Sequence, residues 1–205
     1  SSAASDVYKR QVMDQPDESA GGEDTVLAWI GLYRPEAEEI RSLAEHFQLH
    51  ELAVEDTVQA HQRPKMERYG DTLFTVIRPA VYQDETETVE IGEIHIFTGP
   101  NFVITIRHSE SRGVSRVRKR VEADPELLCF GPDGVLYALL DQIVDDYFPV
   151  LSGLENDIDE IEDALFAGEP NVSQRIYELA REINDFHRGV APLSTVMQRY
   201  FAGFT

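Results

Sequence analysis

Apolar residues in the first half of the chain fall into short runs that predict β-strands. In 102–106, Phe102, Ile104 and Ile106 alternate with other residues, as on one face of a half-buried strand. Together the strands predict a mixed or antiparallel sheet with helices packed on it. The runs are rich in β-branched and aromatic side chains and cover residues 25–33, 72–82, 90–97 and 102–108.

Two amphipathic helices are predicted between the first two strands. Pro35 and several acids suit the first turn of a helix, and the apolar residues that follow have helical spacing, which predicts a helix over 35–48. A second, short helix is predicted over 51–59, and Pro64 ends that pattern. A third helix is predicted over 111–123.

The last third of the chain has a different pattern, with apolar residues at steps of three and four over 136–165 and again over 176–200. The segment between them, "FAGEPNVS", contains glycine and proline. The pattern predicts two long helices that form an antiparallel hairpin, with apolar seams that face each other or a neighbouring chain. Pro149 and Pro192 are expected to kink these helices locally.

Charge narrows the possible functions. The 205 residues include 38 Asp and Glu against 18 Lys and Arg, a formal net charge of −20. Such a surface repels phosphate backbones and attracts cations, so nucleic acid is not an expected partner. A single cysteine, Cys129, excludes an internal disulfide framework. No uncharged apolar run approaches the ~20 residues of a membrane-spanning helix, and the N-terminus has no secretory signal.

Carboxylates supply the candidate cation ligands. Glu55 and Asp56 are adjacent on the helix predicted over 51–59, and Asp141 and Asp145, four residues apart, share one face of the first hairpin helix. Hard divalent ions prefer carboxylate oxygens, and Mg²⁺ uses one or two of them with retained waters. A solvated helix face explains such acids equally well, and it also explains the acidic run "ENDIDEIED" at 155–163.

Other motifs give weaker signals. His46 and His50 have H-x-x-x-H spacing, but the glutamate of zinc proteases is absent and the helix is expected to end between them. The basic residues of 112–120 are expected to pair with the surplus acids. No nucleophile elbow, P-loop or dinucleotide-binding glycine pattern is present, so an enzyme is not expected.

Three segments together resemble the CorA family of magnesium and cobalt transport proteins. They are "FQLHELAVEDTVQAHQRPKMERYGDTLFTVIRP" at 47–79, "YALLDQIVDDYFPVL" at 137–151 and "HRGVAPLSTVMQRY" at 187–200. The first contains the family's Leu-Glu-Asp and His-Gln-Arg-Pro-Lys motifs in order, with Val54 in place of the leucine. Gln48 and Glu51 stand where the family often has Gly and Pro, at a helix boundary.

The resemblance implies a fold and a domain organisation. The fold class is α/β, an α/β/α sandwich with a mixed sheet over 25–130. A long helical hairpin over 131–205 leads toward a stalk helix, and 1–24 is a polar leader expected to be disordered. The sequence is expected to be a fragment, with the Gly-Met-Asn pore signature and both membrane helices beyond Thr205.

The resemblance also implies a function, the regulatory cytoplasmic domain of a homopentameric channel in the inner membrane. Cytosolic Mg²⁺, or Co²⁺ or another divalent cation, would bind between subunits and hold the pore closed. The sensor carboxylate matches Asp56, with Glu55 beside it, and Asp141 and Asp145 match acidic positions near the same interface. The alternatives are a zinc transporter of the same fold, a soluble acidic hairpin that binds a partner helix, and a metal-dependent hydrolase.

Overall fold

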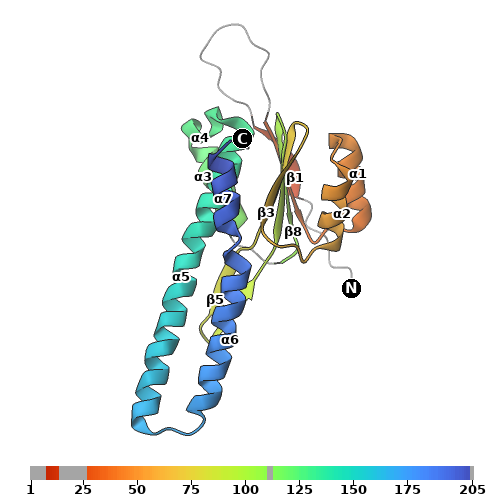
Figure 1. Cartoon of the computed structure of the whole chain (residues 1–205). Coiled ribbons are helices and arrows are strands. Elements are labelled where there is room, and N and C mark those ends of the chain that lie inside the picture. Colours follow the sequence, from red (N-terminus) through yellow and green to blue (C-terminus); the bar gives the residue numbers. More distant parts are fainter. Residues whose placement is uncertain (1–7, 14–26, 110–112, 204–205) are drawn as a thin grey trace.

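A mixed β-sheet lies between two layers of helices, and a helical hairpin extends from one end (Figure 1). The computed structural model describes residues 8–13, 27–109 and 113–203. None of the helices within these ranges is both long and apolar enough to cross a membrane. The architecture is the sandwich with a hairpin that the sequence predicts.

Within the described residues, six strands form the main sheet, in the order β1-β2-β8-β7-β4-β3. β2 and β8 are parallel, whereas the other neighbours are antiparallel, so the sheet is mixed as predicted. The strands are β1 (Tyr8–Met13), β2 (Leu27–Tyr33), β3 (Lys65–Tyr69), β4 (Thr72–Ile77), β7 (Ile94–Thr98) and β8 (Phe102–Arg107).

Side-chain alternation along the strands builds a core on each face of the sheet. Phe102, Ile104 and Ile106 of β8 face one side, and Val103 faces the other. Both sides are covered, which explains why the central strands β4, β7 and β8 are buried almost throughout. The two apolar cores lie on opposite sides of the sheet and hold different helices.

Helices α1 (Ala37–Phe47) and α2 (Glu51–Gln59) cover one face. A capping box between Glu36 and Glu39 starts α1, and Gln48, with a left-handed φ of 54°, ends it. The other face is covered by the first half of α5 (Gly131–Ala167) together with α3 (Gly113–Ala123), α4 (Pro125–Cys129) and α7 (Leu193–Phe201).

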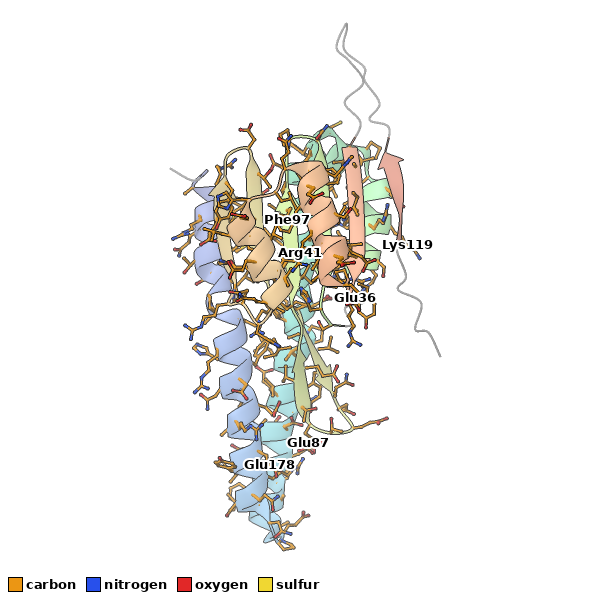
Figure 2. The ribbon with its side chains drawn as sticks, turned by 90° about the vertical axis from the view of Figure 1, so that its right-hand side faces the viewer. Glu36, Arg41, Glu87, Phe97, Lys119 and Glu178 are labelled. Atoms are coloured by element: carbon orange, nitrogen blue, oxygen red, sulfur yellow. The ribbon has the colours of Figure 1, made fainter. Side chains whose placement is uncertain are left out.

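The second half of α5 and α6 (Val172–Val190) form the hairpin, with Gly168 in a left-handed conformation at its turn. A separate two-stranded ribbon, β5 (Ala80–Gln83) and β6 (Thr88–Ile91), runs along it (Figures 1 and 2). Tyr82 donates a hydrogen bond to the buried Asp157 at 2.6 Å. Arg175 bridges Glu87 of the ribbon and Glu160 of α5. Polar contacts therefore fix the hairpin to the ribbon.

Several sequence expectations need correction. The strand predicted over 72–82 is divided at Arg78 and Pro79, because the chain leaves the main sheet there to form the ribbon. The strand predicted over 90–97 is likewise divided, at Gly92 and Glu93. Pro149 lies inside α5, which continues through it, whereas Pro192 separates α6 from α7.

The polar leader also differs from expectation. Residues 1–24 were predicted to be disordered, but Tyr8–Met13 form β1, antiparallel to β2. Pairing at the edge of a sheet uses backbone N–H and C=O groups, so it needs no apolar pattern in the added strand. The hydrophobic pattern of the sequence therefore does not predict this strand.

Candidate functional site

Helix α2 carries the Glu55–Asp56 pair on the outer part of its surface. His50 caps the helix by accepting a hydrogen bond from the backbone N–H of Leu52, and its ring stacks on Tyr69 of β3 at 4.3 Å. Ala53 and Thr57 are buried against the sheet. Glu55 is therefore exposed, and Asp56 lies at the half-buried edge of the helix.

Asp56 contacts a lysine on the strand beneath it. Lys65 Nζ lies 2.6 Å from Asp56 Oδ2 and 2.8 Å from Glu67 Oε2, so two carboxylates share one ammonium group. Tyr69 donates a further hydrogen bond to Glu67. Burial acts to lower the pKa of Lys65, but the hydrogen bonds and charges of Asp56 and Glu67 outweigh it and raise that pKa above its ordinary value.

Glu55 has a different environment. It accepts a hydrogen bond from Gln59 Nε2 at 2.9 Å, one helical turn further along. No ion pair involves Glu55 among the described residues. The pair therefore presents one carboxylate that shares an ion pair, Asp56, and one that has no ion-pair partner among the described residues, Glu55.

Asp141 and Asp145 lie on α5, across the sheet from α2. Asp141 Oδ2 is 2.8 Å from Arg120 Nη1, and the neighbouring Asp146 is 3.3 Å from Arg116 Nη2. Asp145 is exposed. The expected pairing of the basic residues of 112–120 with acids is confirmed for Arg116 and Arg120. Arg112 lies outside the described residues. The structure thus brings together neither the two pairs of candidate ligands nor the two helices that carry them.

Metal-ligand geometry is absent from the described ranges, where no three or more His, Cys, Asp or Glu side chains are grouped to hold a metal ion. The H-x-x-x-H spacing of His46 and His50 also forms no site. The first belongs to α1 and the second caps α2, with the left-handed Gln48 between them. As predicted, the helix ends between the two histidines.

A buried polar cluster beneath the end of α2 was missed by sequence reasoning. Glu93 is 4% exposed and accepts hydrogen bonds from His95 Nε2 at 2.6 Å, Arg78 Nη2 at 3.2 Å and the backbone N–H of Gln62 at 3.2 Å. Burial acts to raise the pKa of Glu93, but these partners outweigh it and hold the pKa below its ordinary value. Glu93 lies in a stretch that reads as an apolar strand, so no sequence signal marks it.

The cluster fixes the loop that follows α2. Ala60 and His61 both have positive φ, 54° and 59°, which is unfavourable for residues with a Cβ. Gln62 holds this loop through its N–H bond to Glu93 and its side-chain bond to the carbonyl of Ala60. The loop ends where β3 starts, at Lys65. The His-Gln-Arg-Pro-Lys segment therefore places Lys65 directly against Asp56.

The chain matches the sequence profile of the family described as "CorA-like Mg2+ transporter protein" over residues 24–203, and it belongs to that family. It is 32% identical over 185 residues to YfjQ of Bacillus subtilis (strain 168), and the aligned region covers 90% of this chain and 57% of that protein. It is 27% identical over 178 residues to the cobalt/magnesium transport protein CorA of Thermotoga maritima, and the aligned region covers 84% of this chain and 50% of that protein. The chain thus spans about half the length of these relatives.

Solved structures show the same fold. The soluble domain of CorA from Methanocaldococcus jannaschii matches with a TM-score of 0.71 at 22% identity, over 84% of this chain and 69% of that one. The ZntB cytoplasmic domain from Vibrio parahaemolyticus matches with a TM-score of 0.67 at 14% identity, over 86% and 70%. These likenesses show a shared fold.

Proposed function

We propose that this chain is the cytoplasmic, cation-sensing domain of a CorA-type channel for divalent cations, magnesium or cobalt, in the inner membrane. The domain has no catalytic role. Membership of the CorA-like family supports this reading, and so does the similarity to a named cobalt/magnesium transport protein. Contact with the membrane, in this proposal, is made by helices that follow the domain in the whole protein.

The observation that carries the proposal is the placement of the candidate ligands on opposite faces of the sandwich. Glu55 and Asp56 lie on α2, whereas Asp141 and Asp145 lie on α5, with the sheet between them (Figure 1). The two sets cannot meet within one chain. They meet if the α2 face of one subunit packs on the α5 face of the next. Such a head-to-tail contact forms a closed ring of identical subunits if the rotation between neighbours closes, and an open filament if it does not.

Exposed apolar side chains beside both sets of acids support this contact. Leu52 and Val58 flank Glu55 on α2 and are 56% and 37% exposed. On α5, Phe148 follows Asp145 by three residues and is 62% exposed. Spacings of three and four residues place neighbours on one helix face. Each proposed contact surface therefore combines apolar area, which favours association, with carboxylates, which oppose it unless a cation is present.

Electrostatics then explains how the domain senses the ion. A chain with a formal charge of −20 repels its copies, and each contact would bring further carboxylates together. A divalent cation between Asp56 of one subunit and the acids of its neighbour relieves that repulsion, and its loss lets the subunits separate. Mg²⁺ is held by few carboxylates and retained waters, so such a site is weak and suits a sensor. In this proposal the ring is a homopentamer, as in the family.

Limited proteolysis of the full-length protein in detergent tests the proposal. Mg²⁺ should protect the wild type against cleavage in a concentration-dependent way. Asp56→Asn, which removes the charge but keeps the shape, should abolish the protection. Glu85→Gln, at the exposed turn of the β5–β6 ribbon, is the matched control and should keep it. A wild-type Mg²⁺ protection curve in Asp56→Asn would overturn the proposal.

A further inference from the structure

Lys65 places a positive charge at the carboxylate of Asp56, the proposed cation ligand. Its ammonium lies 2.6 Å from Asp56 Oδ2, and the side chains of Lys65 and Asp56 are 28% and 25% exposed. The contact is thus sheltered but open to solvent on one side. An ammonium and a divalent cation on the same carboxylate repel each other, so each weakens the binding of the other.

We propose that Lys65 is a built-in counter-ion of Asp56, which a divalent cation displaces when it binds, and that Lys65 thereby sets the cation concentration at which the domain responds. This inference rests on the proposed function of Asp56. It adds Lys65 to that site, as the residue that pairs with Asp56 when no cation is bound.

Lys65 suits this role because its backbone is fixed while its side chain can move. Its neighbour Met66 is buried, and β3 pairs with β4 along its whole length. The preceding loop is held by Glu93 through Gln62. The ammonium itself is at the end of four methylene groups, and it also lies 5.6 Å from the centre of the Phe74 ring. The strand therefore keeps the ammonium within reach of Asp56 while the side chain can still move.

Glu67 makes displacement possible at low cost. It already contacts the ammonium at 2.8 Å, so Lys65 keeps one carboxylate partner after it leaves Asp56. Removing a partially buried charge from all its partners is costly, whereas exchange between two partners avoids an unpaired charge. Tyr69 donates a hydrogen bond to Glu67 at 3.1 Å and holds it in place. Glu67 thus serves as the alternative partner of the displaced lysine.

Lysine acetylation, measured peptide by peptide with mass spectrometry, follows the displacement directly in the full-length protein. Lys65 is one of three lysines in this chain, with Lys9 and Lys119. Lys119 is exposed on α3, on the other side of the sheet, and is the internal control (Figure 2). Addition of Mg²⁺ should raise the acetylation rate of Lys65 about three- to tenfold and leave that of Lys119 unchanged. An unchanged Lys65 rate at Mg²⁺ concentrations that give full protease protection would overturn the inference.

Variants test the competition. Lys65→Met removes the ammonium and should lower the Mg²⁺ midpoint of protease protection about three- to tenfold, while Lys119→Met should leave it unchanged. Glu67→Gln leaves Lys65 to Asp56 alone and should raise the midpoint. This second variant tests the inference even if Lys65→Met fails to fold, and a lowered or unchanged midpoint in Glu67→Gln would contradict it.

The outcomes separate the two proposals. If Asp56→Asn abolishes protection but Lys65→Met has the wild-type midpoint, the counter-ion inference fails and the proposed function stands. If Asp56→Asn retains wild-type protection, the proposed function fails, and the contact of Lys65 with Asp56 is then only a structural ion pair.

Discussion

The two faces of the sheet hold their helices in different ways. On the α5 face, a continuous apolar core runs from the sheet into the hairpin, and Asp141 and Asp146 lie on the outer flank of the helix, where they pair with arginines of α3. On the α2 face, only Ala53 and Thr57 of α2 are buried, and polar contacts connect the helix and its loop to the sheet. A helix that is held by apolar packing keeps its position whether or not a cation is bound. Polar contacts can be exchanged, so the α2 face is the one suited to respond to a cation.

The buried cluster under α2 should show the largest effect. Glu93→Gln removes the charge that Arg78 and His95 contact, and leaves their donors in a buried site without a carboxylate. We expect the free energy of unfolding to fall by about 2–4 kcal/mol in urea denaturation. Asp141→Asn removes a carboxylate from the more exposed ion pair of the α5 face and should cost less than about 1 kcal/mol. Equal losses would mean that the two faces do not differ as described.

Acidification should weaken the α2 face through two groups. Burial, with the nearby charge of His95, lowers the pKa of His108 from 6.5, and the partners of Glu93 lower its pKa from 4.5. In both cases the unfolded chain binds the proton more readily than the folded one. The stability from His108 is therefore complete above pH 6.5 and lost as the pH falls below it, and that from Glu93 is complete above pH 4.5 and lost below it.

The variant His108→Gln isolates the upper window, because the acidic surface also loses charge on acidification. The variant should lose less stability than the wild type as the pH falls from 6.5, in urea titrations across the pH range. His187→Gln, on the exposed side of α6, is the control and should follow the wild-type profile. A wild-type profile of stability against pH in His108→Gln would show that His108 does not cause the loss of stability in this pH range.

The surface ion pairs of α3 with α5 should have the smallest effect. The side chains of Arg120 and Asp141 are 42% and 33% exposed, so solvent and salt screen their attraction. Arg120→Met should change the free energy of unfolding by about 0.5 kcal/mol or less, and high salt should reduce the difference further. A loss above about 1.5 kcal/mol would show that the α5 face also depends on polar contacts.

Periodicity was sufficient to predict α1 and the hairpin, because their apolar spacing is set by one helix face each. It did not predict β3, whose sequence KMERY has one buried residue, Met66. The sequence indicated one residue of the candidate site but not its partner. The motif pointed to Asp56, but its contact with Lys65 depends on how α2 and β3 are joined by a loop with two unfavourable φ values. Glu93 was missed because a buried charge in an apolar run is recognisable only from its partners.

The head-to-tail contact is tested most directly by cross-linking in the full-length protein, in a cysteine-free background that includes Cys129→Ser. Val58→Cys marks the α2 face and Phe148→Cys the α5 face, and both parent side chains are exposed. With a flexible bis-maleimide, the double variant should give a ladder of covalent oligomers up to the closed ring. Either single variant should remain monomeric on a denaturing gel, because like faces never meet. Dimers from a single variant, or no oligomers from the double variant, would contradict the contact.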